Sequence, residues 1–226
     1  MIPFPWPAKD AVHIHCLALA TGVVRYVSPD EIARADRLRD SGKRDSFIAG
    51  RGLLREILGG YLGIKVEDLG FAAGEHGKPY LTGHNASNER LYFNLSHSGA
   101  LFILAVAADR EVGIDAEQLR DDTPFADMAR FVCSPHEQKE LFTLSAHEQR
   151  DAFYRCWTRK EAYLKACGSG FSLMPNSFDI NFFESPYTAF ISPDNRSHWI
   201  LQDIPVPNGY IAALAVKGSV PTCLLM

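Results

Sequence analysis

The chain has 226 residues, of which 46% are hydrophobic and 22% are charged, and its formal net charge is −4. These values are typical of a globular protein with one large domain or two small ones, and a chain of this length buries a core without disulfides or metal staples. Because the net charge is negative, no overall basic field attracts nucleic acid, and we expect no nucleic-acid partner.

The five cysteines are scattered and form no Cys-x-x-Cys pair. This pattern disfavours a disulfide framework or a zinc knuckle and indicates a reducing, cytoplasmic location. The first residues lack the basic region and cleavage site of a signal peptide, and the apolar residues 11–24 are too few to cross a bilayer. We therefore expect no membrane segment.

The first predicted elements are a strand at residues 12–18 and a helix that begins after Ser28, whose side chain caps it. His13 and His15 lie within this strand without an evident third ligand, so we interpret them as structural or exposed residues. A second helix is predicted over residues 45–59, because its apolar residues form one stripe, and Gly59-Gly60 is expected to end it.

Turn residues predict a loop at residues 74–83, and strands are expected at residues 92–95 and 101–107. The last of these segments is a nearly continuous apolar run, which indicates a strand buried on both faces.

In the second half of the chain, a helix is predicted to begin after Ser134, and a long helix at residues 151–166 is expected to end at Gly168. Strands are predicted at residues 112–115, 178–183 and 210–216. Because helices and strands do not alternate strictly, the pattern indicates an α+β fold.

A shift of 106 residues aligns eight residues of the first half with identical residues of the second, where chance would give about two. The pairs are Ser28/Ser134, Pro29/Pro135, Glu31/Glu137, Leu38/Leu144, Arg44/Arg150, Asp45/Asp151, Phe47/Phe153 and Leu58/Leu164. The repeat predicts a pseudo-dimer of two similar α+β halves, at residues 1–115 and 116–226, with a ligand site in the cleft between them. The alternative is that both copies are generic Ser-Pro helix starts.

The sequence Gly113-Ile-Asp115-Ala-Glu117 holds the first candidate site residues. Strand alternation places Asp115 and Glu117 on one side of the strand. Two adjacent carboxylates repel unless a cation lies between them, and they suit an oxygen-seeking ion such as Mg²⁺. The alternative for this short motif is a solvated strand end.

The long helix carries Trp157, Glu161 and Lys165 at i, i+4 and i+8, so the three side chains form one stripe. An exposed Glu–Lys pair is the simplest interpretation. The functional interpretation has Glu161 complete a three-carboxylate metal site while Lys165, a compact point charge, contacts a phosphate.

A third group consists of Asn94-Leu-Ser96-His97-Ser98 and the upstream Gly77-Lys78-Pro79. Serine, histidine and lysine at a strand exit can hydrogen-bond phosphate oxygens. Ser96 and His97 are poorly placed as nucleophile and base, since adjacent strand residues point in opposite directions, and the chain has no Gly-x-Ser-x-Gly elbow. This pattern disfavours a serine hydrolase.

Together, and in this order, these motifs resemble the 4′-phosphopantetheinyl transferases of the surfactin-synthetase-activating type. The long-helix motif Trp157-Thr-Arg-Lys160-Glu161-Ala-Tyr-Leu-Lys165 resembles the branch with Trp and Lys-Glu-Ala. The resemblance spans residues 77–165, and a weaker match at residues 44–55 extends it toward the N-terminus. It implies a pseudo-dimeric fold with the active site between the halves.

The resemblance also implies roles for individual residues. Asp115, Glu117 and Glu161 match Mg²⁺ ligands, and Glu161 also matches the base that deprotonates a carrier serine. Lys165 matches a pyrophosphate contact. The further coenzyme A contacts implied by the motifs are Lys78, Pro79, Ser96 and His97, with Arg51 favoured over Arg34 and Arg44 for the 3′-phosphate.

The implied reaction transfers phosphopantetheine from coenzyme A to the serine of an apo acyl or peptidyl carrier protein, and we expect a monomeric enzyme. A non-catalytic module that binds coenzyme A or a carrier protein on the same fold is the main alternative. A magnesium-dependent hydrolase of a nucleotide pyrophosphate is the second.

Overall fold

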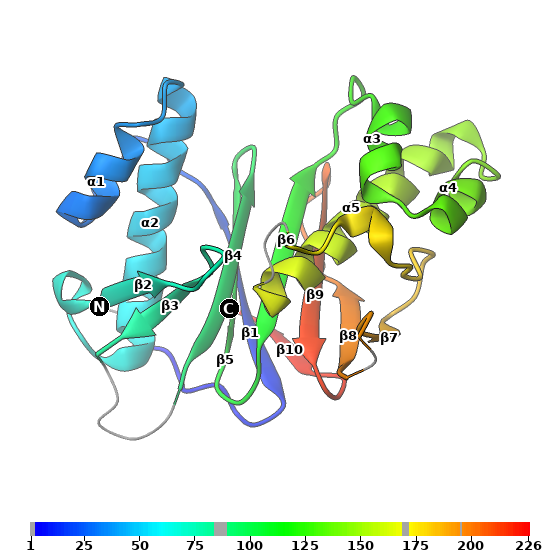
Figure 1. Ribbon diagram of the computed structural model, residues 1–226. Helices are drawn as coiled ribbons and strands as arrows, with labels where there is room; N and C mark the ends of the chain where they lie inside the picture. The colour runs from blue at the N-terminus through cyan, green and yellow to red at the C-terminus, as the bar shows by residue number, and fades with distance from the viewer. Residues whose placement is uncertain (1–2, 84–89, 169–171, 195) are drawn as a thin grey trace.

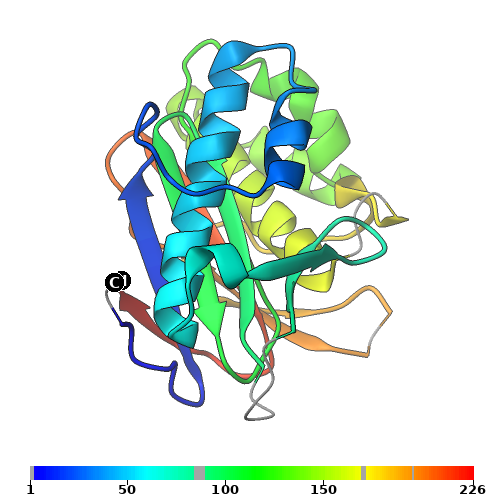
Figure 2. The same cartoon turned by 90° about the vertical axis from the view of Figure 1, so that its left-hand side faces the viewer.

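The computed structural model describes residues 3–83, 90–168, 172–194 and 196–226. Figure 1 shows two halves side by side, each built from a sheet and one long helix. In the view turned by 90°, helices α1 and α2 lie in front of the first sheet (Figure 2). The mixture of helices and sheets confirms the predicted α+β fold.

In the described part of the first half, residues 3–83 and 90–107, there are seven helices and strands and one short 3₁₀ segment. They are β1 (Ala11–Ala18), α1 (Pro29–Ala35), α2 (Ser41–Leu62), the 3₁₀ segment Val66–Asp68, β2 (Gly70–Ala73), β3 (Pro79–Thr82), β4 (Tyr92–Ser98) and β5 (Leu101–Ala107). Strands β2 and β3 form a separate antiparallel hairpin.

The second half begins with the strand that carries the predicted metal ligands. Its elements are β6 (Val112–Gln118), α3 (Phe125–Val132), α4 (Pro135–Leu141), α5 (Ala146–Cys167), the 3₁₀ segment Pro175–Ser177, β7 (Thr188–Ile191), β8 (His198–Asp203) and β9 (Tyr210–Lys217). The last strand, β10 (Thr222–Leu225), returns to the first sheet and pairs in parallel with β1.

The two halves repeat one arrangement, as the sequence predicts. The first sheet has the order β10-β1-β5-β4 and the second has the order β6-β9-β8-β7. Because β1 pairs antiparallel with β5 and β6 pairs antiparallel with β9, β1 and β6 occupy equivalent positions in the two sheets. Short helices α1 and α4 precede the long helices α2 and α5. The repeated Ser and Glu form identical capping boxes, in which Ser28 pairs with Glu31 and Ser134 with Glu137.

The core has three layers of apolar side chains because the strands alternate between faces. Phe102, Leu104 and Val106 of β5 pack against α2, whereas Ile103 and its neighbours face the second sheet. Likewise, alternate residues of β9 pack either toward α5 or toward the first sheet. Every residue of β5 is buried, which confirms that this strand is covered on both faces.

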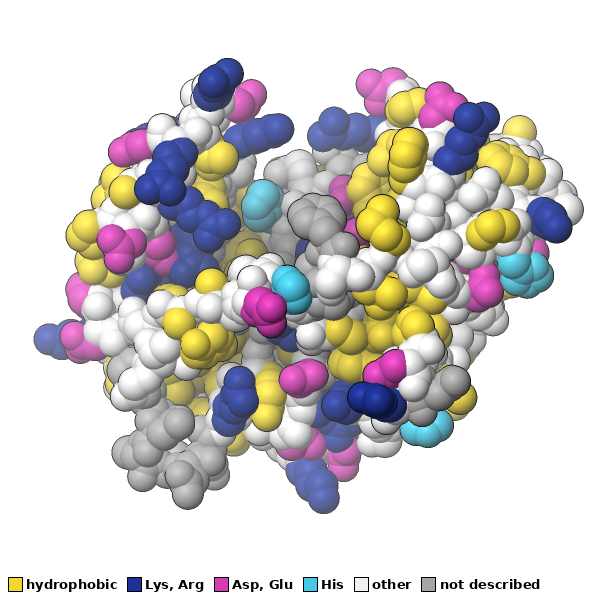
Figure 3. Space-filling model, in the orientation of Figure 1, with side chains coloured by type: hydrophobic (Ala, Val, Ile, Leu, Met, Phe, Trp, Pro, Cys, Tyr) yellow, Lys and Arg dark blue, Asp and Glu magenta, His cyan; other side chains and the backbone are white. Residues whose placement is uncertain are grey.

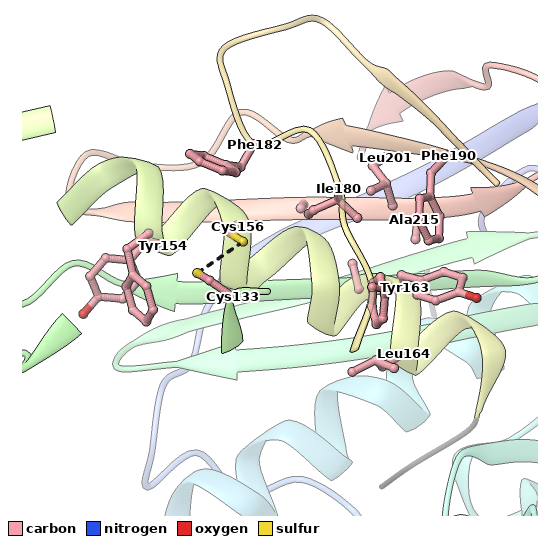
Figure 4. Close-up of a cluster of buried hydrophobic side chains, with 14 of the residues drawn as sticks. Cys133, Tyr154, Cys156, Tyr163, Leu164, Ile180, Phe182, Phe190, Leu201 and Ala215 are labelled. Atoms are coloured by element: carbon pink, nitrogen blue, oxygen red, sulfur yellow. Dashed lines mark hydrogen bonds between the residues drawn. The ribbon is translucent and has the colours of Figure 1, made fainter. Parts of the chain in front are cut away.

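Aromatic residues dominate the layer between α5 and the second sheet (Figure 4). Tyr163 makes edge contacts with Phe178, Phe190 and Trp199. Nearer the start of α5, the free thiol of Cys156 lies 3.7 Å from that of Cys133, the residue that follows α3, in the same layer. This packing fixes α5, the helix that carries two of the predicted catalytic residues. No helix in the described part of the chain combines the length and apolar character that a membrane span requires.

The end of the second helix and the loop at residues 74–83 differ from their predictions. Helix α2 continues through Gly59 and Gly60 and ends at Gly63, whose φ of 66° is left-handed. A glycine inside a helix costs only about 1 kcal/mol, which the burial of neighbouring apolar residues such as Leu58 outweighs. The predicted loop at residues 74–83 contains strand β3, which pairs with β2. Pro79, which has no N–H to donate, is tolerated because it occupies the first position of this strand.

The predicted strand at residues 178–183 is wrong, because this segment has no regular structure. Side chains bind its backbone groups in place of a neighbouring strand. Glu137 accepts the N–H of Ile180, Lys160 donates to the carbonyl of Phe178, and Arg159 donates to the carbonyls of Asn181 and Phe183. The strands of this region, β7 and β8, lie farther along the chain.

Candidate active site

Strand β6 directs its two carboxylates toward α5. Val112, Ile114 and Ala116 face the first sheet, so the alternate residues Asp115 and Glu117 project on the opposite face. Gly113 lies on that same face, and a Cβ atom there would be only 2.0 Å from the Ala162 carbonyl oxygen. The glycine therefore permits α5 to cross β6 closely enough to bring its side chains to the two carboxylates.

Helix α5 supplies a lysine that contacts Asp115 directly. Lys165 Nζ is 2.6 Å from Asp115 Oδ1 and 2.9 Å from Ser96 Oγ of β4. Ser96 Oγ in turn donates to the same Asp115 oxygen at 2.9 Å. Side chains from both halves thus meet at one point, as the sequence predicts for a cleft site.

Glu117 and Glu161 both lie in surroundings that disfavour their charge. Burial and the charge of Asp115 raise the pKa of each carboxyl, while Lys165 partly opposes the shift. Ser98 Oγ donates a hydrogen bond to Glu117 Oε2, which also opposes the shift of that group. A cluster of repelling carboxylates is the electrostatic setting in which a divalent cation is stabilising.

The oxygens of Asp115 provide a test of whether the residues fit a cation. Asp115 Oδ2 is buried and has no hydrogen-bond partner among the described residues. Buried polar atoms are normally satisfied, and an unpartnered carboxylate oxygen suits a metal ion. The ligand atoms of Asp115, Glu117 and Glu161 do not all lie within 4.8 Å of one another, because among the described residues only Cys133, Glu137 and Cys156 meet that limit.

A cavity of about 520 Å³ opens beside these groups. Glu161, Lys165 and Lys78 contribute its charged edge, whereas most of the remaining wall is apolar, including Trp157 and Phe131. The space-filling view shows the surface hollowed between the two halves (Figure 3). A second cavity of about 380 Å³ is lined by Glu117 and shares Trp157 with the first. The site can therefore accept an elongated ligand with a charged part and an apolar part.

Two family models match the chain. One describes the N-terminal part of 4′-phosphopantetheinyl transferases and matches residues 18–109, and the other describes the 4′-phosphopantetheinyl transferase superfamily and matches residues 111–215. The 4′-phosphopantetheinyl transferase HetI of Nostoc sp. is 38% identical over 192 residues, which cover 85% of this chain and 79% of HetI. The chain belongs to the 4′-phosphopantetheinyl transferase superfamily.

More distant relatives agree with this assignment. The 4′-phosphopantetheinyl transferase Sfp of Bacillus subtilis is 26% identical over 189 residues, covering 84% of this chain and 81% of Sfp. A Xenopus laevis relative, named L-aminoadipate-semialdehyde dehydrogenase-phosphopantetheinyl transferase, is 28% identical and covers 85% of this chain and 68% of its own. The chain is an enzyme that transfers the phosphopantetheine group to carrier proteins, and none of these relatives favours the alternative of a non-catalytic module.

Lys78 of the transferase lies at the C-terminal end of α5. Its Nζ donates to the carbonyl oxygens of Ala166 at 2.6 Å and Val112 at 3.2 Å, so it joins α5 to β6. Burial lowers the pKa of the Lys78 ammonium. Pro79 begins β3 and lines the 520 Å³ cavity together with Lys78. Both residues therefore border the predicted site, and Lys78 is held there by its hydrogen bonds to α5 and β6.

His97 and Ser96 of the transferase point to opposite sides of β4, as expected for adjacent strand residues. Ser96 faces Asp115 and Lys165 and is buried, whereas His97 is exposed on the other face. Partial desolvation and the charge of Lys165 lower the pKa of His97. The structure thus brings Ser96 into the carboxylate cluster and leaves His97 beside it.

Arg51 lies on α2, away from the carboxylate cluster. It forms an ion pair with Glu31, which also accepts from Arg55 at 2.8 Å, and its guanidinium lies 4.6 Å from the centre of the Phe71 ring. The other two candidates, Arg34 and Arg44, contact Phe47 and Asp36. All three arginines therefore have protein partners in this structure.

Two residues of the quoted motifs, to which the sequence analysis assigns no role of their own, support the site. Ser98 contacts Glu117, and the period of two that it shares with Ser96 was the available signal. Lys160, the lysine of the Lys-Glu-Ala motif, has no exposed side-chain surface and forms an ion pair with Glu137. The sequence gives no sign that Lys160 is buried, because a lysine next to Glu161 in a helix is normally exposed.

Proposed function

We propose that this transferase moves the 4′-phosphopantetheine group of coenzyme A to a serine hydroxyl of an apo acyl or peptidyl carrier protein and releases 3′,5′-bisphosphoadenosine. The observation that carries the proposal is the contact of Lys165 and Ser96 with Asp115, beside two carboxyls of raised pKa at the edge of a 520 Å³ cavity. This arrangement places positive charge, carboxylates and an apolar channel together, as the proposed substrate requires.

Asp115, Glu117 and Glu161 are the proposed ligands of Mg²⁺. When bound, the ion neutralises pyrophosphate charge and stabilises the leaving oxygen. The unpartnered Oδ2 of Asp115 and the mutual repulsion among the carboxyls support this ligand set. Lys165 contributes a positive charge to the phosphate oxygens at which negative charge develops.

Glu161 is also the proposed general base. It lines the cavity, so its carboxylate has access to a serine hydroxyl that enters there. Burial and Asp115 raise its pKa, and a carboxylate of higher pKa is a better proton acceptor near neutrality. Glu161 would accept the proton of the carrier serine while the serine oxygen attacks the β-phosphate.

Coenzyme A contacts are proposed for residues on both sides of the cleft. Lys78, Pro79, Ser96, His97 and Lys165 border the cavity or the carboxylate cluster, and Arg51 is the proposed contact for the 3′-phosphate. In this division, residues 1–115 contribute most nucleotide contacts and residues 116–226 contribute the catalytic helix. Strand β6 crosses the boundary and carries one metal ligand on each side of it.

The proposed enzyme is a cytoplasmic monomer without nucleic-acid or membrane partners. The net charge of −4 supports the absence of a nucleic-acid partner, and the five free thiols support a reducing, cytoplasmic location.

The test is incubation with coenzyme A, Mg²⁺ and a panel of apo carrier proteins, followed by intact-mass spectrometry. A transferase produces a heavier carrier and the bisphosphate, whereas a pyrophosphate hydrolase releases phosphopantetheine without modifying the carrier. Asp115→Ala should abolish transfer and keep the fold, while Asp45→Ala, which removes an exposed carboxylate on α2, should retain activity. Near-normal transfer by Asp115→Ala would contradict the metal site.

A further inference from the structure

Strands β4 and β6 belong to different sheets but are joined by side chains. Asn94 Oδ1 accepts the backbone N–H of Ile114 at 2.8 Å, and Ser96 Oγ donates to Asp115 at 2.9 Å. Two residues farther along, Ser98 Oγ contacts Glu117. Alternate residues of β4 thus form hydrogen bonds with successive parts of β6. These side-chain contacts extend along the strand that carries two proposed metal ligands.

The hydrogen bonds of Ser98 fix the direction of its hydroxyl proton. The backbone N–H of Gln118 donates to Ser98 Oγ at 3.1 Å, and Ser98 Oγ lies 2.8 Å from Glu117 Oε2. A serine hydroxyl has one proton. Because the amide uses a lone pair of Oγ and the ionised carboxylate can only accept, the proton points toward Glu117.

Ser96 provides a parallel case in the same strand. It accepts from Lys165 Nζ and donates to Asp115 Oδ1, just as Ser98 accepts from an amide and donates to Glu117 Oε2. Two serines two residues apart therefore orient two carboxylates two residues apart. In each pair the serine binds one carboxylate oxygen, which leaves the second oxygen of the carboxylate for another partner.

We propose that Ser98 is a positioning residue that holds the Glu117 carboxylate in the orientation required to bind the metal ion. The inference rests on the proposed three-carboxylate site and adds a residue that acts on the ion only through Glu117. Partners that orient metal ligands typically change metal affinity by about ten- to a hundred-fold when they are removed. In this proposal Ser98 acts through its hydrogen bond to Glu117 Oε2 and is not itself a ligand of the ion.

The test measures metal binding directly. Free Mn²⁺ is followed by electron paramagnetic resonance during titration of the full chain in the presence of coenzyme A. We expect Ser98→Ala to raise the Mn²⁺ dissociation constant about ten- to a hundred-fold, with Ser98→Thr restoring most of the affinity because it keeps the hydroxyl. Ser185→Ala is the matched control, since Ser185 is half-buried like Ser98 and its hydroxyl donates to the Tyr187 carbonyl and not to a carboxylate of the site.

The KM for coenzyme A distinguishes a positioning role from a role in folding. If Ser98 only positions Glu117, Ser98→Ala should leave the KM for coenzyme A within about twofold at saturating metal, because the lost contact lies on Glu117 and not on the nucleotide. If Ser98 is needed for folding, the KM for coenzyme A should change as well. If the alanine variant folds poorly, Ser98→Cys keeps the side-chain volume and has a weaker donor, so an intermediate metal affinity is expected.

Three outcomes decide the inference. Weaker Mn²⁺ binding by Ser98→Ala with an unchanged coenzyme A KM supports it. Wild-type Mn²⁺ affinity in Ser98→Ala overturns it while leaving the proposed function intact. If the wild-type protein binds no Mn²⁺ at a saturable site, both the proposed metal site and this inference are wrong.

Discussion

Glu137 and Lys160 form an ion pair in which neither side chain has any exposed surface. Lys160 Nζ also donates to the carbonyls of Pro175 and Phe178, and Glu137 accepts the backbone N–H groups of Ser134 and Ile180. The pair therefore joins α5 and α4 to the irregular segment that follows α5. Its position next to Glu161 makes it a support for the active-site helix.

Lys160→Met should destabilise the protein strongly, because the substitution leaves the Glu137 carboxylate buried without its cation. Removing one partner of a buried pair costs about 3–5 kcal/mol. Urea denaturation followed by circular dichroism measures the change. Lys139→Met on the exposed face of α4 is the control and should change stability by less than about 0.5 kcal/mol. Normal stability of Lys160→Met with lost transfer would instead place Lys160 in the chemistry.

Gly113→Ala should impair both folding and activity. The new Cβ would lie 2.0 Å from the Ala162 carbonyl oxygen and 2.4 Å from the Ala166 nitrogen, so α5 would have to move away from β6. Overpacking of this kind typically costs about 1–3 kcal/mol or more, and the movement would also displace Glu161 and Lys165. Thermal melting and single-turnover transfer measure the two effects.

A matched glycine in α2 distinguishes crowding from a general effect of the substitution. A Cβ at Gly50 would meet Phe102 Cδ2 at an ordinary 3.8 Å, so Gly50→Ala should gain up to about 1 kcal/mol from helix propensity. If Gly113→Ala were as stable as Gly50→Ala and fully active, the close crossing of β6 and α5 would not limit the site.

Glu161→Gln separates the role of base from that of metal ligand. The amide keeps one oxygen for the ion but accepts a proton poorly, and loss of a general base typically costs about a hundred- to ten-thousand-fold. We expect this variant to bind coenzyme A yet transfer at least about a hundred-fold more slowly at every Mg²⁺ or Mn²⁺ concentration. Single-turnover transfer across a metal titration is the measurement.

Lys165→Ala is the comparison for that experiment. It removes the partner of Asp115 and a charge from the phosphate site, so it should weaken coenzyme A binding as well as transfer. Recovery of Glu161→Gln to the wild-type rate at high metal concentration would show that Glu161 is a ligand alone.

The protein should lose stability when the pH falls from about 6.5 toward 4. His13 Nδ1 and His15 Nε2 both lie 2.8 Å from Tyr61 Oη, and burial followed by the charge of His13 lowers the pKa of His15 from 6.5 to about 4. Between these values the unfolded chain binds the proton and the folded chain does not, so stability is greatest above the unfolded pKa and falls on acidification.

The size of this effect is at most about 3.5 kcal/mol for His15, since its pKa falls from 6.5 to about 4 and each pKa unit corresponds to about 1.4 kcal/mol. Urea denaturation at several pH values measures it. His15→Gln should flatten the dependence, whereas the exposed His198→Gln should retain the wild-type slope. Equal slopes in wild type and His15→Gln would contradict the assignment to this buried group.

The sequence predicts the active-site elements better than the segments around them. The period of the strand and helix patterns predicts that Asp115 lies on one face with Glu117 and Glu161 with Lys165, and the 106-residue repeat predicts the two halves. Local patterns succeed here because alternation and helical spacing are properties of the backbone itself.

The errors arise where distant partners override local preference. Residues 178–183 have the composition of a strand, yet side chains of α4 and α5 bind their backbone groups instead. Similarly, the pairing of β10 with β1 joins residues more than two hundred positions apart, and no local pattern specifies such a contact. The role of Lys160 depends in the same way on a distant partner, Glu137.

The return of β10 to the first sheet bears on how the protein unfolds. Because β10 follows β9 directly but hydrogen-bonds to β1, loss of the second half would uncover an edge of the first sheet. The side-chain join between β4 and β6 ties the halves at the opposite edge of that sheet. Although the two halves have the size and layout of separate domains, they are expected to melt together in a single cooperative transition.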